Sequence, residues 1–343
     1  MSNDTTDDYR SIVVGDVAVI DVRSPAEFSR GAISSARNLP ILDDAEREQV
    51  GITYRTRGRE AAITRGHELV SGELKRRRIQ SWIDVCDHNP SSVLCCWRGG
   101  LRSSIAQKWL VENRRNVPCV EGGYKSLRRY TQKVLESVAN RNVVVLGGRT
   151  GTGKTELLRE FSNAIDLEDL ARHRGSAFGG LNELQPMPQS FDFALAAELL
   201  RTESLQFLLI EDESRMIGKL HLPPELFESM ARAPLVVLDA PFEQRIEFTF
   251  NNYVIGQDYA QLRNNLQRIE KRLGGVNYKS ISESMSAAME SGKTSDHSNW
   301  IKRLLEDYYD PMYDYQLSKK QNRIVFHGNT REVSEFLRSQ YSG

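Results

Sequence analysis

Short apolar runs alternate with amphipathic stretches over residues 11–139. Three of the runs have the length and the β-branched side chains of buried strands: VAVIDVR (17–23), SSVLCC (91–96) and VPCVE (117–121). Segments with helical character follow these runs, within SPAEFSRGAI (24–33), at 103–113 and at 124–139. Ser24 and Pro25 suit the N-cap and the first position of the first helix. This alternation predicts an α/β fold whose sheet is largely parallel.

A second series of apolar runs begins with RNVVVLGG (141–148). We expect its strands at 142–146, 206–210, 235–239 and 323–326. The stretch at about 256–310 is polar and helix-rich, which indicates a helical insertion. The pattern therefore predicts a disordered tail at 1–10, one α/β domain at 11–139 and a second at 140–343.

Composition limits the setting of the protein. No apolar run in the 343 residues approaches the length of a membrane-spanning helix. The first residues are acidic and polar, and the 4 cysteines lack paired metal-binding spacing. We therefore expect a cytoplasmic protein with free thiols and no membrane association. We also expect a monomer, although composition does not decide this. Positive and negative charges balance overall, yet residues 55–78 and 96–133 are basic. Such segments could bind phosphate groups, or they could be solvated helix faces.

The loop after the strand at 142–146 has the Walker A pattern, in which Gly148 is followed after four residues by Gly153, Lys154 and Thr155. Gly151 and Gly153 allow the backbone to turn its N–H groups towards a phosphate. Lys154 would add a full positive charge, and the Thr155 hydroxyl could bind Mg²⁺. A glycine-rich turn without a ligand is the alternative. We expect a phosphate site, but the pattern does not identify the phosphate compound.

An acidic partner for this loop is expected at the end of a later strand. FLLIEDESR (207–215) offers Glu211, Asp212 and Glu213, and LVVLDAP (235–241) offers Asp239. We favour the first three because adjacent acids after an apolar strand are costly unless a cation lies near them. Asp239 could equally be a turn or cap residue. We expect no permanent metal and no tightly bound cofactor, and Mg²⁺ would accompany a diphosphate substrate.

A second loop, SSVLCCWRGGLRSS (91–104), places Cys96 at the end of a buried strand with five residues between it and Arg102. Its glycines allow a turn, and Ser103 or Ser104 could cap the next helix. Arg98 and Arg102 would favour the Cys96 thiolate and make it nucleophilic. The other cysteines, Cys86, Cys95 and Cys119, better fit inert buried positions. A cysteine phosphatase and a sulfur carrier both use such a loop.

The upstream run VIDVRSPAEFSRGAISSARNLP (19–40) favours the sulfur carrier. It resembles the opening motif of the rhodanese family at Asp21, Val22, Arg23, Glu27, Phe28, Gly31, Ala32, Ile33, Ala36, Asn38, Leu39 and Pro40. A cysteine phosphatase usually has a histidine before its cysteine, where this chain has Cys95. The common sulfurtransferase loop is one residue shorter than the loop from Cys96 to Arg102. The longer loop admits a larger atom or group.

A rhodanese-like domain joined to a P-loop domain resembles the bacterial tRNA 2-selenouridine synthase family. The similar stretches are CWRGGLRS (96–103), ARHRGSAFGG (171–180), EDESRMIG (211–218) and YYDPMYDYQL (308–317). The resemblance implies that sulfur of 2-thiouridine at the tRNA wobble position is replaced by selenium from selenophosphate. It implies the tRNAs for lysine, glutamate and glutamine as substrates. It also implies geranyl diphosphate as the donor that forms an S-geranyl-2-thiouridine intermediate.

The resemblance also implies roles for individual residues. Cys96 would carry selenium as a selanyl-cysteine, and the Walker A loop would hold a diphosphate. The two basic segments would bind the anticodon arm, whose wobble base is unpaired and can be read without melting a duplex. Trp97 could stack on a base, although packing is the commoner role of a tryptophan. The remaining candidate substrate contacts in the similar stretches are His173, Arg174, Ser176 and Arg215.

Two other hypotheses stay open at this point, besides a generic phosphatase, which would explain neither the upstream motif nor the second domain. The chain could be a P-loop phosphotransferase regulated by its rhodanese-like domain, in which case nucleotide turnover would survive Cys96→Ser. It could also be a tRNA-binding module whose two loops only hold anions. The second hypothesis is disfavoured because both loops retain their reactive residues.

Overall fold

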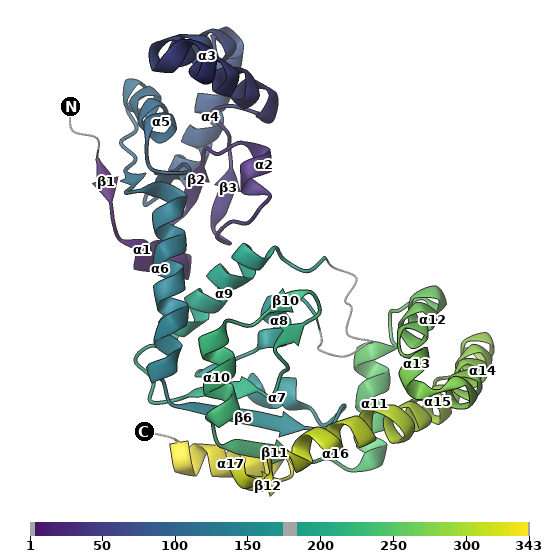
Figure 1. The fold of residues 1–343 in the computed structure, drawn as a ribbon. Helices are drawn as coiled ribbons and strands as arrows, with labels where there is room; N and C mark the ends of the chain where they lie inside the picture. The colour runs from purple at the N-terminus through teal and green to yellow at the C-terminus, as the bar shows by residue number, and fades with distance from the viewer. Residues whose placement is uncertain (1–3, 174–183, 342–343) are drawn as a thin grey trace. The chain divides into compact units, whose positions relative to one another are not determined.

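The computed structural model describes residues 4–173 and 184–341, which form two compact units (Figure 1). Unit 1 comprises residues 1–136 and 186–203, and unit 2 comprises residues 137–185 and 204–343. Each unit is an α/β structure built around a parallel sheet. The fold class expected from the alternating pattern is therefore confirmed.

The sheet of unit 1 has the strand order β1-β5-β4-β2-β3, with parallel neighbours. Its strands are β1 (Thr5–Thr6), β2 (Val19–Asp21), β3 (Ala36–Asn38), β4 (Val93–Cys95) and β5 (Cys119–Val120). The predicted strands at 17–23, 91–96 and 117–121 correspond to β2, β4 and β5. The residues of β2 and β4 are buried and, apart from Asp21, apolar, as expected for strands covered on both faces.

Helices cover this sheet and enclose a core that includes Ile20, Leu94 and the stacked rings of Trp82 and Trp109. They are α1 (Tyr9–Val14), α2 (Pro25–Phe28), α3 (Asp44–Leu69), α4 (Gly72–His88), α5 (Leu101–Glu112), α6 (Gly123–Ser137) and α9 (Pro188–Arg201). Helix α2 begins as predicted, with Ser24 at its N-cap and Pro25 in its first turn. Helix α3 is kinked at Gly58, where φ is 83°.

The expected disordered tail at 1–10 is wrong for the residues that the structure describes. Thr5 and Thr6 form β1, which pairs with Cys119 and Val120 at the edge of the sheet. Helix α1 then begins at Tyr9, with the carboxylate of Asp8 accepting the Ser11 N–H at its N-terminus. A strand of two polar residues has no apolar alternation, so the sequence pattern gave no sign of it.

The compact units do not coincide fully with the expected domains at 11–139 and 140–343, because α9 belongs to unit 1. Helix α9 packs along α1 and buries Phe191, Phe193 and Leu195. Polar contacts fix it further, since Arg128 pairs with Asp192 at 2.9 Å and the Ala32 N–H donates to Ser190 at 3.0 Å. Segments 137–185 and 204–343 form the second unit, and the chain between them belongs to unit 1.

The sheet of unit 2 has the order β12-β11-β6-β8-β7, again with parallel pairs. Its strands are β6 (Val143–Gly148), β7 (Ala164–Ile165), β8 (Leu208–Glu211), β11 (Leu235–Leu238) and β12 (Ile324–Gly328). The strands predicted at 142–146, 206–210, 235–239 and 323–326 are thus present. A short antiparallel hairpin, β9 (Met216–Ile217) and β10 (Leu220–His221), follows β8.

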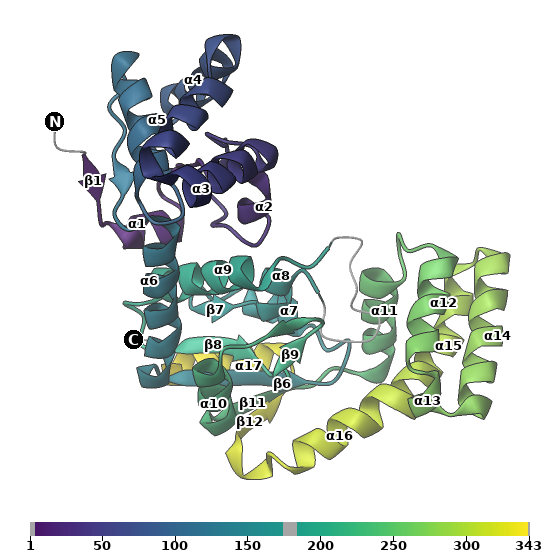
Figure 2. The ribbon, with the colours of Figure 1, turned by 45° about the horizontal axis from the view of Figure 1, so that its top comes forward.

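Helices of unit 2 fall into two groups. Those near the sheet are α7 (Lys154–Leu158), α8 (Leu167–Ala171), α10 (Pro224–Arg232) and α17 (Thr330–Tyr341). The others are α11 (Phe242–Tyr253), α12 (Tyr259–Arg268), α13 (Glu270–Leu273), α14 (Gly275–Ser291), α15 (His297–Leu304) and α16 (Asp310–Ser318). Helices α12, α14 and α15 lie side by side (Figure 2) and share an apolar core around Trp300. This helical group extends beyond the insertion expected at 256–310, since α11 begins at Phe242 and α16 ends at Ser318.

Within the described ranges, no helix is both long enough and apolar enough to cross a membrane.

Candidate active site

Cys96 directly follows β4 and is buried at the start of the loop that leads to α5. Its Sγ atom lies 3.2 Å from the Ser103 hydroxyl and 4.0 Å from the Gly100 carbonyl oxygen. Gly100 is the N-cap of α5, whereas Ser103 and Ser104 lie in the first turn and donate to the Gly100 carbonyl. The expectation that either serine caps the helix is therefore wrong. Ser103 instead places a hydroxyl against the candidate nucleophile.

The loop is anchored on the turn between β5 and α6. The Tyr124 and Lys125 N–H groups donate to the carbonyls of Cys96 and Trp97, at 2.8 and 3.1 Å. Gly99 has φ +60°, and a Cβ there would lie 2.8 Å from the Val120 carbonyl oxygen. A side chain at Gly99 would therefore push the loop away from β5. The turn between β5 and α6 therefore fixes the position of Cys96.

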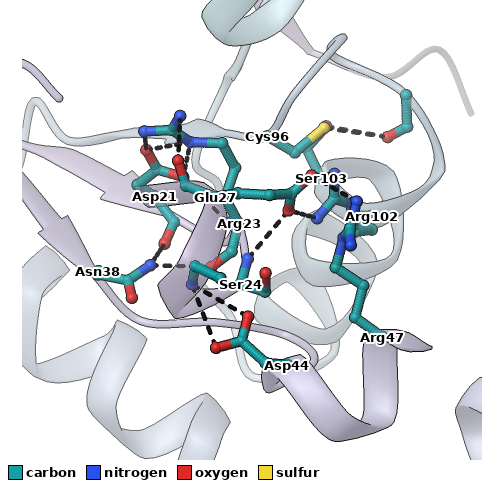
Figure 3. A network of polar contacts seen from close by, with 12 residues as sticks. Asp21, Arg23, Ser24, Glu27, Asn38, Asp44, Arg47, Cys96, Arg102 and Ser103 are labelled. Carbon is teal, nitrogen blue, oxygen red and sulfur yellow. Dashed lines mark hydrogen bonds and ion pairs between the residues drawn. The ribbon is translucent and has the colours of Figure 1, made fainter. Parts of the chain in front are cut away.

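A pocket of about 540 Å³ opens onto Cys96. Its charged lining residues are Glu27, Arg30, Arg47, Arg98 and Arg102. Figure 3 shows the Arg102 guanidinium against Glu27, to which it donates two hydrogen bonds, at 2.5 and 3.2 Å. Arg47 also contacts this carboxylate, at 3.2 Å. Arg102, which we expected to act on an anion, is therefore already paired.

Burial raises the pKa of Glu27, but the hydrogen bonds and charge of Arg102 outweigh it, so this pKa lies below its ordinary value. Glu27 is ionised at neutral pH and neutralises one arginine of the pocket. The exposed side chains of Arg30 and Arg98 make no ion pair within the described residues, so they retain charge for an anionic ligand.

A buried ion pair between Arg23 and Asp21 supports the wall of the Cys96 pocket. The Arg23 side chain is fully buried, and its Nε donates to both oxygens of Asp21, at 3.0 and 2.8 Å (Figure 3). The same guanidinium lies over the Tyr124 ring at 3.7 Å and donates to the Glu27 carbonyl. Two residues of the rhodanese-like motif thus hold α2 and the α6 turn in place. Their role is structural.

The other cysteines differ from Cys96 in their surroundings. Burial raises the pKa of the Cys95 thiol well above its ordinary value, and burial raises the pKa of Cys119 to about 11. Both remain thiols at neutral pH, and neither lines the pocket. Trp97 does line it, with its ring stacked on Tyr124 at a centroid distance of 5.5 Å. This packing accounts for Trp97, and a base-stacking role stays a prediction.

The Walker A loop follows β6, at the carboxyl end of a central strand. Gly151 has φ +83°, and a Cβ there would lie 2.7 Å from the Arg245 carbonyl oxygen. Gly153 precedes α7, whose first residues are Lys154 and Thr155. Lys154 Nζ donates to the Gly148 carbonyl at 2.9 Å, so its ammonium group lies over the loop. This arrangement is suited to a phosphate group.

The three acids after β8 separate into two environments. Carboxylate oxygens of Glu211 and Glu213 gather with one of Glu168, all within 4.8 Å of one another. Asp212 instead pairs with Lys320 through two contacts of 2.7 Å. The Glu213 N–H donates to the Glu211 carbonyl at 2.9 Å, so Asp212 lies in a tight turn between the other two acids. Asp239, the weaker candidate, contacts His327 at 2.5 Å.

Crowding of these acids opposes their ionisation. Burial, followed by the charge of Glu168, raises the pKa of Glu211 well above its ordinary value. The same two causes raise the pKa of Glu213 to about 8, although the charge of Lys154 lowers it in part. The Glu211 carboxylate accepts the Glu168 N–H at 2.9 Å. A divalent cation would relieve the repulsion, and the carboxylate donors suit Mg²⁺.

Helix α16 holds the Walker A loop through two aspartates. Asp314 pairs with Arg149 of the loop, and Asp310 pairs with Arg245. The buried Arg245 also donates to the Thr150 carbonyl at 2.9 Å. Both aspartates belong to the stretch YYDPMYDYQL (308–317), which gives that stretch a physical role.

The structure does not gather the remaining predicted contacts. Arg215 is exposed at the start of the β9–β10 hairpin. His173 is half-buried, and burial lowers the pKa of its ring below the ordinary value, with the charge of Arg268 adding to this. Arg174 and Ser176 lie outside the described residues.

Sequence reasoning missed Ser103 as a partner of Cys96, Glu27 as the partner of Arg102, and Glu168 as the third acid. Glu27 was present only as part of the rhodanese-like motif. Glu168 lies in DLEDL (166–170), whose acids gave no reason to prefer one of them. The spacing of Asp310 and Asp314, four residues apart, is the signal of a shared helix face that could have indicated the clamp.

The chain has relatives among known proteins. Residues 141–342 match a family model described as tRNA 2-selenouridine synthase AAA domain, and residues 6–130 match the rhodanese-like domain. The chain is 43% identical to a tRNA 2-selenouridine synthase of Sulfurovum sp. (strain NBC37-1) over 355 residues, which cover 96% of this chain and 97% of that one.

Among solved structures, the N-terminal domain of a Clostridium difficile 630 protein described as ATP/GTP-binding is 32% identical. The likeness covers 33% of this chain and 88% of that one, with a TM-score of 0.31, and carries no argument about the fold. The two family models and the Sulfurovum relative extend over nearly the whole sequence. This chain therefore belongs to the tRNA 2-selenouridine synthase family.

Proposed function

We propose that this protein converts 2-thiouridine at the tRNA wobble position to 2-selenouridine, with S-geranyl-2-thiouridine as an intermediate. The main support is that one chain has two different reactive loops, a Cys96 pocket with free arginines and a Walker A loop beside three acids. The name of the Sulfurovum relative supports the product. The protein is accordingly a transferase that acts on tRNA, selenophosphate and geranyl diphosphate.

The first half-reaction alkylates the thiocarbonyl sulfur. Sulfur attacks the first carbon of geranyl diphosphate, the carbon–oxygen bond breaks, diphosphate leaves with the electron pair, and the base loses its N3 proton. The Walker A loop suits this diphosphate, because Gly151 and Gly153 shape the loop and Lys154 supplies charge. Thr155, Glu211 and Glu213 would hold Mg²⁺ on the diphosphate.

The second half-reaction introduces selenium. The Cys96 thiolate attacks the selenium of selenophosphate, and the electron pair of the selenium–phosphorus bond leaves on phosphorus as phosphite. The selanyl-cysteine then attacks C2, and the C2–sulfur bond breaks with loss of geranyl thiolate. An external thiol supplies the two electrons that open the remaining selenium–sulfur bond. Arg30 and Arg98, which line the pocket, suit the anionic donor.

The basic segment 55–78 supports binding of the anticodon arm in part. Arg65, Arg76 and Arg78 are engaged by Glu68, Glu73 and Glu46. Within the described ranges, no ion pair forms to the exposed side chains of Arg55, Arg57 and Arg77. These three arginines are therefore the better phosphate contacts, and the tRNAs for lysine, glutamate and glutamine are the proposed substrates.

The test uses an anticodon stem-loop that contains 2-thiouridine, digested to nucleosides for mass spectrometry after incubation. Three mixtures contain geranyl diphosphate, selenophosphate, or both with a thiol reductant. Each is repeated with Cys96→Ser and with Lys154→Ala. We expect 2-selenouridine with both donors, and its loss in Cys96→Ser. The geranyl product should survive in Cys96→Ser and should be lost in Lys154→Ala.

Absence of any new nucleoside, from folded protein that binds the stem-loop, would contradict the proposal. Nucleotide hydrolysis that survives Cys96→Ser, without a modified base, would instead favour a P-loop phosphotransferase with a regulatory rhodanese-like domain. Mass spectrometry of the intact protein after incubation with selenophosphate alone tests the selanyl-cysteine directly. One added selenium atom is expected in wild-type protein and none in Cys96→Ser.

A further inference from the structure

The pocket at Cys96 is the first of three adjoining cavities along α3. A hollow of about 670 Å³ adjoins it and shares Arg47 and Arg102 with its lining. A third cavity of about 380 Å³ shares Leu42, Val50 and Tyr54 with that hollow. Arg102 lines all three cavities. The three cavities therefore adjoin one another, and this row of cavities, called here the groove, runs from the nucleophile to the space between α3 and α5.

The two ends of this groove differ in chemistry. The Cys96 end has the arginines described above, whereas Ile41, Ile63, Ile105 and Trp109 line the far end. Side chains at the far end that would normally be covered remain partly open, with Tyr54 59% exposed and Leu101 42% exposed. An apolar cavity of this volume with open apolar walls is typical of a ligand site. Its ligand should have a polar, reactive part and an apolar chain.

We propose that the far cavity, called here the α3–α5 pocket, binds the geranyl chain of S-geranyl-2-thiouridine while C2 of the base lies at Cys96. This inference rests on the function proposed above. In the step it serves, the C2–selenium bond forms and the C2–sulfur bond breaks. The electron pair leaves with sulfur as geranyl thiolate, which takes a proton from water. Selenium adds to C2 before sulfur leaves, and a held chain would fix the position of the departing sulfur relative to the attacking selenium.

The test compares two leaving groups on one enzyme. Stem-loops with S-geranyl-2-thiouridine or S-methyl-2-thiouridine are supplied with selenophosphate and a thiol reductant. Ile63→Trp would fill the α3–α5 pocket from the partly buried wall of α3. Ile52→Trp is the matched control, since Ile52 lies on the same helix, is 45% exposed and lines none of the three cavities.

We expect Ile63→Trp to lower kcat/KM for the S-geranyl substrate at least about tenfold relative to the S-methyl substrate. The ratio should stay unchanged in Ile52→Trp. Ile63→Ala, which enlarges the cavity, should raise the relative rate on an S-farnesyl stem-loop several-fold. This second variant keeps the test valid if the tryptophan variant does not fold.

The outcomes separate the two proposals. Wild-type protein that makes no 2-selenouridine from the S-geranyl stem-loop would overturn the proposed function, and this inference with it. If the wild-type protein is active and the Ile63 variants keep its ratios of kcat/KM among the S-geranyl, S-methyl and S-farnesyl stem-loops, the pocket assignment alone is overturned. Loss of geranylation of 2-thiouridine in Ile63→Trp, with selenation intact, would also overturn it, because the cavity would then serve geranyl diphosphate.

Discussion

One carboxylate, Glu27, sets the charge of the Cys96 pocket. It accepts hydrogen bonds from Arg102 and from the Ser24 N–H, and it contacts Arg47. Without it, the partly buried Arg102 and the exposed Arg47 would lie close together with no counter-charge. The Glu27 side chain is 10% exposed and that of Arg102 is 24% exposed, so solvent screens this pair less than it screens the surface pairs of the chain. Glu27 therefore matters for folding as well as for the pocket.

Glu27→Gln should lower the free energy of unfolding at neutral pH by about 2–3 kcal/mol, because it leaves a partly buried arginine without its charge partner. The folded-state pKa of Glu27 lies below its ordinary value of 4.5. Its contribution is therefore present above that pH and is lost as pH falls through the folded-state pKa. Urea unfolding at about pH 7 and about pH 3 should show the two proteins converging in acid. A gap of equal size at both pH values would contradict this reasoning.

Glu68→Gln is the matched control. Glu68 pairs with Arg65, but the two side chains are 58% and 41% exposed. An ion pair this open is worth about 0–1 kcal/mol. Its removal should change the urea midpoint little at either pH.

At the scale of single elements, α16 acts as a strap on the Walker A loop. Its two aspartates lie four residues apart and each pairs with an arginine, but the two arginines differ in burial. Asp310 reaches Arg245, whose side chain is 4% exposed, whereas Asp314 reaches Arg149, which is 38% exposed. Desolvation decides which of the two contacts matters for folding and which matters only for the shape of the loop.

Asp310→Asn should cost about 3 kcal/mol of stability, because it leaves a buried guanidinium without its carboxylate. Asp314→Asn should cost less than about 1 kcal/mol. Both should reduce transfer of the geranyl group, since each loosens the diphosphate loop. Thermal unfolding and mass spectrometry of the nucleosides measure the two effects. Equal loss of stability in both variants would refute the role assigned to burial.

Glu213, two residues after the end of β8, makes the stability of the fold depend on pH. Burial and Glu168 raise the pKa of Glu213 from 4.5 to about 8, so the folded protein binds a proton that the unfolded chain releases. The contribution of Glu213 to the free energy of unfolding is therefore at its maximum below pH 4.5. It decreases as pH rises towards about 8. Glu213→Gln stays neutral and should be more stable than wild type by at least about 1 kcal/mol above that range. Thermal unfolding in the absence of divalent cations, at about pH 6 and about pH 9, should show the gap opening at the higher pH. Parallel curves would exclude the shift.

The elements also show what the sequence could and could not predict. Buried strands such as β4 and β6 contain no polar side chains. Each is followed by a glycine-rich loop, a pattern typical of loops that bind anions. Their positions were therefore predictable. Glu168 and Lys320 were not, because their partners lie 43 and 108 residues away. No local pattern records such contacts, and choosing among the acids at 211–213 depended on them.

Over the whole molecule, the order of elements in the chain differs from their order in space. Unit 1 is completed by α9, which the chain reaches only after β6, β7 and the Walker A loop. The buried side chains of α9 include Phe191, Phe193, Leu195, Leu199 and Leu200. Each fully buried side chain of this kind contributes about 1.5–3 kcal/mol, so the helix provides an amount similar to the whole stability of a domain, about 5–15 kcal/mol.

A fragment of residues 1–140 should therefore be largely unfolded, although it contains the whole rhodanese-like motif. Adding a peptide of residues 186–203 should restore a cooperative thermal transition, because it supplies the apolar face that packs on α1. The same peptide with Phe193→Ser should fail, since Phe193 is buried and its ring meets that of Tyr124 at 5.7 Å. Circular dichroism of the three samples measures the outcome. A fragment that unfolds cooperatively without the peptide would show that unit 1 folds independently of α9, and the boundary near residue 140 would then be the one that governs folding.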